Sequence, residues 1–496
     1  MSAALKSRCG GDAASVDVPR DSAWEWLAKQ LGMPVLLSTP ARNPRDIKLP
    51  VSQLDGNMLA ELIGITGPDR VHTNSFERTI HARARDYPGA LALHSAEITH
   101  VPDAVVYPQT GAETQATISF AARNGFAVIP WGGGSVGADC KHARTIVINL
   151  SRMSQVMANT DIFEAGLCGF EIRHALQASG RRPAAMPGAF DCATLGGWIA
   201  GSGARGSRPG WLRAATIATP QGMLDMNDPD MCNVLIGSNG AAGIITEARI
   251  LTRTLPEARE TRIFLFRDFE SGVESLYHAA QEEAVEVSAF LSGTREAQFR
   301  RAFVNQEQHW GEIFGGMYRD VRGFDAKAVT LSITFEGMQR LVDGAVTRAE
   351  ISAANIGALF LKNSAELKGP TLKDLRPALL DRGAAAQDFV TEVRWENLLE
   401  TRHRLAVALE KALQFNAPHP DSKGLALFAL TSPAAETVLL RLTYVFPRLL
   451  GGEAGQWQKI AEAVRAIVPR EGTESRKNLR AVKRLVDPEN MLPPVG

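Results

Sequence analysis

A run of glycines between two short apolar segments is the strongest chemical signal in the sequence. It extends over Ile129–Ala138 and contains three consecutive glycines, Gly132–Gly134. The segments on either side, 126–129 and 145–150, are short, rich in β-branched residues and bounded by breakers, which predicts two buried strands. Residues without a Cβ atom let backbone N–H groups approach a ligand closely, as they do in pyrophosphate-binding loops. The run therefore favours a nucleotide-binding loop, and a plain glycine turn is the alternative.

The spacing of Gly132, Gly134 and Gly137 also satisfies the G-x-G-x-x-G pattern of Rossmann dinucleotide-binding units. That pattern requires a helix to begin at the third glycine. Only residues 139–144 separate the run from the next predicted strand, and a helix does not fit there. We therefore reject the Rossmann interpretation and keep that of a nucleotide loop between strands.

Two further glycine-rich segments follow the first. Residues 201–210 are nearly all glycine, serine and arginine, which suits either an anion-binding loop or a solvated surface loop. Residues 236–247 carry three glycines and run directly into a predicted strand. Because the three segments lie within about 120 residues and adjoin strands, they favour one extended ligand that the backbone approaches at several points.

The elements that must position these loops alternate between strands and helices. A strand over 103–108 leads to a helix that begins at Thr110, where Thr110 and Glu113 form a capping-box pattern, and ends at Gly125. Beyond Pro256, strands are predicted over 261–268, 285–291, 329–335 and 358–362, and helices over 337–355 and 395–415. Helices that cover one face of an antiparallel sheet give an α+β domain, so we expect an α+β fold.

Composition excludes several classes of protein. The chain has 496 residues, and its 54 basic and 54 acidic residues cancel, which gives no electrostatic reason to expect nucleic acid as a partner. Five widely spaced cysteines without a C-x-x-C pair predict neither a zinc site nor a disulfide framework, and they favour a reducing compartment. Neither a secretory signal nor a long apolar run is present, so we expect a cytoplasmic protein without a transmembrane segment.

The order of these motifs resembles the PCMH-type FAD-binding domain of the vanillyl-alcohol oxidase superfamily. Within it, the sequence looks most like the branch of alkyldihydroxyacetonephosphate synthase. The segments that carry this similarity are His81–Arg83 with Tyr87-Pro88, Thr194–Ala200, Leu375–Asp381 and Ala481–Leu492. The resemblance extends over about residues 75–496, and it implies a two-lobed FAD-binding domain and an α+β cap domain with an antiparallel sheet.

The resemblance and the predicted elements together divide the chain into five parts. These are a disordered lead (1–20), an N-terminal helical segment (21–100), the FAD-binding domain (101–256), the cap or substrate domain (257–440) and a C-terminal helical segment that returns to the FAD-binding domain (441–496).

The resemblance also implies FAD as the cofactor and the residues that hold it. Binding is expected to be non-covalent, because the sequence lacks the Gly-Gly-His that links flavin covalently. The implied cofactor residues are Pro130, Trp131, Gly132, Gly133, Gly134, Ser135, Val136, Asp191, Thr194, Leu195, Gly196, Gly197, Asn239, Gly240, Ala241, Ala242, Gly243, Ile244 and Ile245.

The catalytic groups of the synthase branch are largely missing. Arg376 falls where the branch has a substrate-binding arginine, and a surface arginine at a helix start is the alternative. On the strand expected to carry the acid–base tyrosine, 424–430, Phe428 stands in its place. No histidine follows His419, although the branch has a histidine cluster near its C-terminus. Arg376 and His419 are the only candidates for catalysis, and His419, next to two prolines, is as readily a loop residue.

Three functions remain open at this stage. The first is an FAD-dependent oxidoreductase that acts on a small hydroxy acid, an alcohol or a lipid-phosphate substrate. The second is ether-lipid synthesis of the alkyldihydroxyacetonephosphate synthase type. The third is a non-catalytic relative that serves as a binding or assembly module. We expect a small-molecule or lipid-like substrate as partner, with a homodimer as one option for the oligomeric state.

Overall fold

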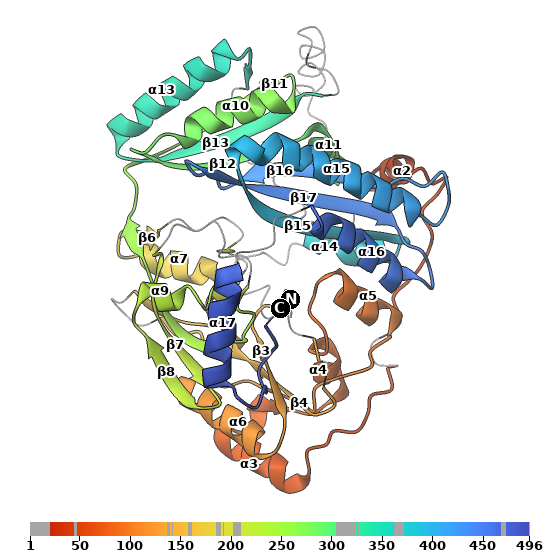
Figure 1. Cartoon of the computed structure of the whole chain (residues 1–496), viewed down its shortest axis with the longest axis vertical. Helices are drawn as coiled ribbons and strands as arrows, with labels where there is room; N and C mark the ends of the chain where they lie inside the picture. The colour runs from red at the N-terminus through yellow and green to blue at the C-terminus, as the bar shows by residue number, and fades with distance from the viewer. Residues whose placement is uncertain are drawn as a thin grey trace. The chain divides into compact units, whose positions relative to one another are not determined.

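The computed structural model of the chain describes most of its length. The described residues are 20–43, 47–135, 139–140, 142–156, 161–184, 190–191, 193–201, 210–303, 324, 327–361, 372–467 and 473–495. They fall into two compact units (Figure 1). The first unit contains residues 41–255 and the C-terminal residues from 473, and the second contains residues 20–40 and 256–467.

The first unit is built on two four-stranded sheets. One sheet has the strand order β1-β2-β4-β3, in which β2, β4 and β3 are parallel and β1 is antiparallel to β2. The other is antiparallel throughout, in the order β5-β9-β7-β8. The strand bounds are β1 Val71–His72, β2 Ala104–Val106, β3 Ala127–Trp131, β4 Thr145–Asn149, β5 Ile162–Glu164, β7 Leu212–Thr219, β8 Gly222–Met226 and β9 Ile244–Ile250, and a separate pair joins β6 Arg181–Pro183 to β10 Thr252–Thr254.

Helices connect and cover these sheets. The predicted helix between β2 and β3 is confirmed as α6 (Gly111–Arg123), and Thr110 accepts a hydrogen bond from the Glu113 N–H (3.1 Å). The Glu113 carboxylate bonds the Gln109 N–H and Arg70, so the cap is only half of a capping box. The other helices of the unit are α3 Gly56–Thr66, η2 Pro68–Arg70, α4 Ser75–Ile80, α5 Tyr87–Ser95, η3 Leu150–Arg152, α7 Gly169–Gln177, α8 Leu195–Ala200, α9 Pro229–Cys232 and α17 Thr473–Val486.

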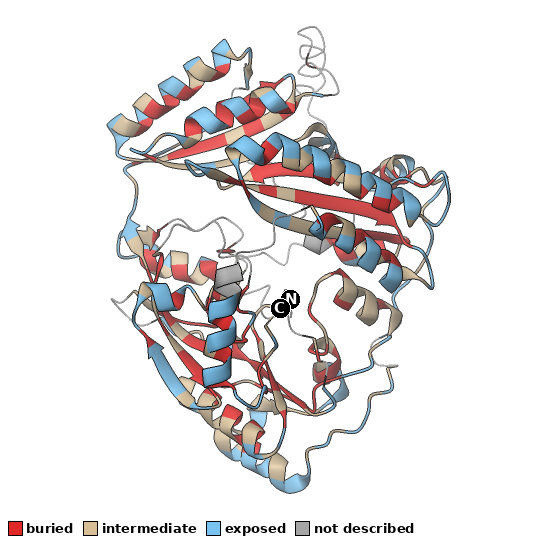
Figure 2. Cartoon of the chain, in the orientation of Figure 1, coloured by how far each residue is buried: buried red, intermediate tan, exposed pale blue. Residues whose placement is uncertain are grey.

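One hydrophobic core joins both sheets of the first unit. It takes Phe120 from α6, Ile148 from β4, Ile217 from β7 and Ile244 from β9, all of them almost fully buried. Figure 2 shows the same arrangement, with buried positions on the strands and on one side of the helices. Both sheets pack on this core, so the loops that adjoin their strands, such as the one after β3 and the one before β9, are held on a rigid base.

The second unit is a seven-stranded antiparallel sheet with helices, as the α+β prediction requires. Its strand order is β14-β11-β13-β12-β16-β17-β15. The strands are β11 Ala258–Phe266, β12 Glu286–Ser292, β13 Val329–Gly337, β14 Leu359–Leu361, β15 Ala384–Arg394, β16 Leu425–Thr431 and β17 Thr437–Pro447. The helices are α2 Asp21–Gln30, α10 Phe269–Ala280, α11 Thr294–Phe303, α13 Gln339–Asn355, α14 Leu372–Leu380, η6 Trp395–Asn397, α15 Leu398–Phe415 and α16 Glu453–Arg465.

Two expected boundaries need correction. Residue 440 lies inside β17, which pairs along its length with β15 and for seven residues with β16, so the cap sheet continues past that point. The N-terminal segment is divided near residue 40, because α2 packs in the second unit, where Trp24 contacts Phe303 edge-on at 5.1 Å between ring centroids. The first boundary was wrong because the sequence pattern placed no strand over 384–394 or 437–447. The second was missed because the packing of α2 depends on tertiary contacts.

The C-terminal tail is fixed to the parallel sheet of the first unit by a buried ion pair. The Lys483 ammonium donates to the Asp487 carboxylate (2.6 Å), and that carboxylate also accepts the N–H groups of Met491 and Leu492. The carbonyl of Met491 in turn accepts the N–H of Val128 on β3 (2.8 Å). Asp487 therefore closes the turn that brings the tail alongside the strand before the glycine loop.

Replacing Asp487 with alanine should destabilise the first unit by roughly 3 kcal/mol, because the buried Lys483 ammonium and two N–H groups lose their acceptor. Chemical denaturation monitored by circular dichroism measures the loss. Glu489→Ala, at an exposed site in the same turn, is the matched control and should change the free energy of unfolding by less than about 0.5 kcal/mol. Equal effects of the two substitutions would contradict a structural role for the ion pair.

Candidate functional site

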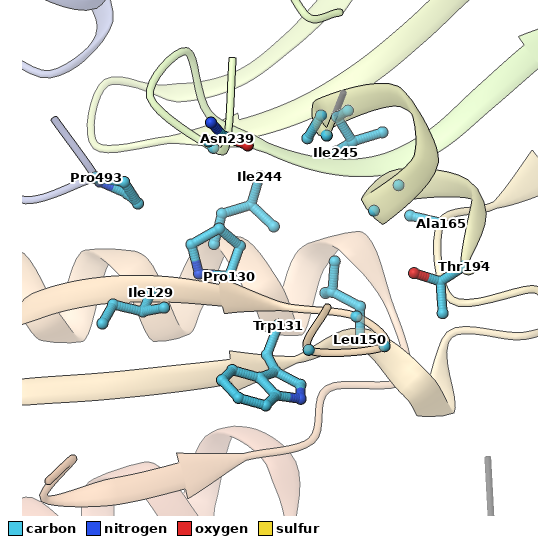
Figure 3. A pocket seen from close by; sticks show the side chains of 18 of the residues that line it. Ile129, Pro130, Trp131, Leu150, Ala165, Thr194, Asn239, Ile244, Ile245 and Pro493 are labelled. Atoms are coloured by element: carbon cyan, nitrogen blue, oxygen red, sulfur yellow. The ribbon is translucent and has the colours of Figure 1, made fainter. Parts of the chain in front are cut away.

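A pocket in the first unit lies among three glycine-rich loops (Figure 3). The first loop leaves β3, the second leads into α8, and the third precedes β9. The lining residues are Ile129, Pro130, Trp131, Gly132, Gly133, Gly134, Ser135, Leu150, Ala165, Thr194, Gly196, Gly197, Ala200, Gly201, Asn239, Gly240, Gly243, Ile244, Ile245 and Pro493. Parts of the first and third predicted glycine segments thus meet around one space, whereas the second loop of the pocket is the one at Thr194–Gly197, and most of the predicted segment 201–210 lies outside the described residues.

The glycines of the pocket allow contacts between backbones that a side chain would prevent. A Cβ atom on Gly132 would lie 2.2 Å from the Thr194 Oγ1 atom, and one on Gly240 would lie 2.5 Å from Cγ of Pro130. Gly240 also has a φ of +84°, which L side chains rarely adopt. The first loop therefore touches the second at Gly132 and the third at Gly240, and both contacts require glycine.

The first loop presents backbone donors to the pocket. The N–H groups of Gly133, Gly134 and Ser135 have no acceptor among the described residues, although all three residues line the pocket. Successive N–H groups without partners form an anion-binding concavity. Such an arrangement fits the phosphates of a nucleotide and is satisfied when a ligand supplies the oxygen atoms.

Thr194 contributes a buried hydroxyl without a partner. Its residue is 1% exposed, and Oγ1 makes no hydrogen bond within the described part of the chain. The oxygen lies close to both Gly132 and Gly197 at the lining of the pocket (Figure 3). A buried polar atom with no partner costs free energy, so its retention at this place indicates a bound group.

Most of the predicted cofactor residues line this pocket, and the others divide into three groups. Leu195, Ala241 and Ala242 are fully buried in the core behind it. Asp191 forms an ion pair with Arg173 and does not line the pocket. Val136, with most of the segment 201–210, lies outside the described residues.

Six lining residues were not predicted. Ile129, Leu150 and Ala165 are apolar residues of strands or their ends, and Ala200 and Gly201 end α8. Pro493 comes from the C-terminal tail, half of the chain or more away from the other lining residues. No local signal in the sequence could place Pro493 there, because its position depends on the Asp487 turn.

The candidate catalytic residues lie on different elements of the second unit. Arg376 is 6% exposed on α14, and His419 is exposed, 3.6 Å from Asp421. Phe428 faces α15, where the Arg402 guanidinium lies 5.4 Å from its ring centroid, and Leu425 and Leu427 point to the opposite face, toward α2 and α14. No group of three or more metal-ligating side chains occurs among the described residues, and none of the described helices is long and apolar enough to cross a membrane.

Comparison with known proteins agrees with this geometry. Residues 102–225 match a family described as an FAD binding domain. The alkyldihydroxyacetonephosphate synthase of Dictyostelium discoideum is 27% identical over 421 residues, which cover 77% of this chain and 69% of that protein. A solved structure of alkyldihydroxyacetonephosphate synthase superposes with a TM-score of 0.79 at 22% identity, covering 95% of this chain and 90% of that one. The structure of p-cresol methylhydroxylase gives a TM-score of 0.65 at 14% identity, with coverage of 90% and 97%.

The chain thus has an FAD binding domain over residues 102–225, and it shares its fold with solved alkyldihydroxyacetonephosphate synthase. The predicted α+β fold and the cofactor are confirmed. The pocket fits FAD by its own chemistry, because it combines three N–H groups and a Thr194 hydroxyl that have no partner among the described residues with glycines that leave no room for a Cβ atom. With FAD bound, the N–H groups of Gly133–Ser135 would suit its phosphates, and the apolar Ile129, Leu150 and Ile244 would suit its uncharged parts.

Gly132→Ala should weaken FAD binding at least about tenfold, since the new methyl group must push the loop away from Thr194. Titration with FAD, followed by the change in flavin fluorescence, measures the affinity. Gly64→Ala on α3 is the control: nothing lies within 4 Å of its added Cβ, so it should leave FAD affinity unchanged and stabilise the helix by about 0.5–1 kcal/mol.

Thr194→Val should weaken FAD binding about fivefold without lowering the stability of the FAD-free protein. The side chains have nearly the same shape, and the hydroxyl has no partner to lose before the cofactor binds. Denaturation of the FAD-free protein and FAD titration give the two readouts. Unchanged affinity would show that this oxygen does not contact the cofactor.

Proposed function

We propose that this chain is a flavoenzyme that binds FAD non-covalently and oxidises the C–OH group of a small hydroxy acid, an alcohol or a lipid-phosphate. The observation that carries the proposal is the intact pocket, with its free N–H groups and the unpaired Thr194 hydroxyl. A scaffold that no longer bound the cofactor would have no use for a buried hydroxyl without a partner. Non-covalent attachment follows from the absence of Gly-Gly-His.

The residues of the chain bind and orient the cofactor, and bound FAD supplies the hydride acceptor. The N–H groups of Gly133–Ser135 and the Thr194 hydroxyl are proposed to hold the anionic centre of the cofactor. Close contact between Gly240 and Pro130 fixes the third loop against the first, so that the two sides of the pocket keep one spacing. A rigid pocket of this kind suits two-electron transfer, because the protein contributes mainly by positioning the cofactor and the substrate.

The missing proton-handling groups separate the oxidation from the synthase reaction. In the exchange of an acyl group for an alkyl ether, a fatty carboxylate leaves as the anion, the incoming alcohol loses its proton as the C–O bond forms, and both substrates must be positioned, whereas oxidation of a C–OH group needs only one proton acceptor. Phe428 has no exchangeable proton and is turned toward Arg402, and the sequence has no histidine after His419. The losses therefore weigh more heavily against synthesis than against oxidation.

Ether-lipid synthesis of the alkyldihydroxyacetonephosphate synthase type is the second candidate. It is favoured by the names of several relatives, including the protein of Dictyostelium discoideum. Arg376 is then the proposed site for an anionic substrate group, since a guanidinium fork suits phosphate. Incubation with acyl-dihydroxyacetone phosphate and a fatty alcohol, followed by analysis of the lipid products, tests this candidate directly.

The oxidoreductase proposal predicts that purified protein carries absorbance bands of oxidised flavin that are released on unfolding. Under anaerobic conditions, a panel of hydroxy acids and alcohols should include at least one compound that bleaches these bands. Gly132→Ala, loaded with less flavin, should show a proportionally smaller change. If flavin binds but no compound bleaches it and no ether lipid is formed, a non-catalytic binding module remains as the function.

Cytoplasmic residence is also part of the proposal, and it agrees with the free, buried Cys140, Cys168 and Cys232.

A further inference from the structure

The segment after α4 holds the glycine loop from the side opposite the pocket. The Arg85 N–H donates to the carbonyl of Gly134 (2.7 Å), and the Cys140 N–H donates to the carbonyl of Ala82 (3.0 Å). The Ala84 N–H bonds the Asp139 carboxylate (3.3 Å). These bonds connect residues 82–85 to the loop before and after its undescribed part, so displacement of this segment displaces the loop.

His81 begins this segment and packs against the aromatic ring below the loop. Its ring lies 4.7 Å from that of Trp131, centroid to centroid, and is only 3% exposed. The Trp131 indole also contacts Gly134, where a Cβ atom would come within 2.4 Å of Cζ2. The His81 ring, tilted by 57° to the indole, and the Gly134 backbone thus both pack against Trp131, which lines the cofactor pocket.

Hydrogen bonding determines which nitrogen of His81 carries the proton. The Asn149 Oδ1 atom accepts the Ser151 N–H (3.0 Å), so the Asn149 amide must turn its Nδ2 donor toward His81 Nε2, 2.9 Å away. His81 Nε2 is therefore an acceptor, and the proton resides on Nδ1, which donates to the carbonyl of Glu77 (2.9 Å). The observed network accommodates only the neutral imidazole, because a protonated Nε2 would face another donor.

The surroundings also favour the neutral form. Burial lowers the pKa of His81 and outweighs the opposite effects of the Glu77 carbonyl and carboxylate, and His72 on β1 lowers it further. Other titratable groups lie around it: Tyr107, which donates to Glu77 (2.8 Å), Arg152, 5.7 Å from the Tyr107 ring, Cys140, whose thiol donates to the His81 carbonyl (3.8 Å), and Arg85. An exposed histidine has a pKa of about 6.5, and that of His81 is lower. The neutral form of His81 therefore predominates above about pH 6.5, and it is lost only as the pH falls below that value.

We propose that His81 is a positioning residue for FAD, and that its neutral imidazole holds Trp131 and the glycine loop in the conformation that binds the cofactor. The inference rests on FAD binding at this pocket and is independent of the reaction proposed above. Protonation breaks the bond to Asn149 and loosens the packing of His81 against Trp131, so FAD affinity falls in mild acid. The residue acts through Trp131 and the loop and does not itself contact the cofactor.

Titration of the FAD-free protein with FAD between about pH 8 and about pH 5.5 tests the inference. We expect the affinity to fall about tenfold below about pH 6.5 while the circular dichroism spectrum stays constant. His81→Phe keeps an aromatic ring against Trp131 and should bind FAD with an affinity that no longer depends on pH. His403→Phe, on the exposed surface of α15, is the control and should keep the wild-type pH profile.

Asn149→Asp is the decisive variant because a merely structural role of His81 would not predict its effect. The new carboxylate can still accept the Ser151 N–H, and its second oxygen accepts a proton from Nε2, so the variant fits the charged imidazole. Its FAD affinity should be retained at about pH 5.5 and fall as the pH rises, opposite to the wild type. A flat wild-type profile, or the same slope in both proteins, would overturn the inference, whereas no FAD binding at any pH would instead overturn the cofactor assignment.

Discussion

The close approach of three backbone loops is the constraint on which the first unit depends. Gly132 lies against Thr194 and Gly240 against Pro130 at separations that leave no room for a Cβ atom. At the same place, the N–H groups of Gly133–Ser135 and the Thr194 hydroxyl have no partner within the part of the chain that the structure describes, which costs free energy. Polar groups that stay unpaired at a pocket indicate a ligand whose atoms form the missing hydrogen bonds.

Support for the first loop comes from two parts of the chain that are distant in sequence. The segment 82–85 bonds it on one side, and the Met491 carbonyl bonds β3 at Val128, within the strand from which the loop departs. Both supports depend on buried polar groups, His81 in the first case and Asp487 in the second. The cofactor site is thus held by interactions that are sensitive to charge, whereas its lining is mostly apolar or glycine.

The sequence contained more information about the cofactor site than about the cap. Glycine constrains the backbone locally, so the loops after β3 and before β9 were visible as spacing, and the capping residue Thr110 placed α6 correctly. Pro493 was invisible because only the tertiary turn at Asp487 brings it to the pocket. In the cap, β15 and β17 were missed. Alternate residues of β16 face opposite sides of the sheet, and Phe428 belongs to the side covered by α15. That Phe428 replaces an acid–base tyrosine stays a prediction.

The two units therefore carry different kinds of evidence about function. In the first, bound FAD would supply partners for the N–H groups of Gly133–Ser135 and for the Thr194 hydroxyl, which have none among the described residues. In the second, the described sheet face around Leu425 and Leu427 is filled by apolar side chains of α2, α11 and α14, and the candidates Arg376 and His419 are respectively buried and exposed in separate surroundings. Several proton transfers require several such groups at one place. Oxidation by a bound flavin requires less, because the cofactor performs the redox step and the protein needs one proton acceptor, so loss of the synthase residues does not by itself argue for loss of catalysis.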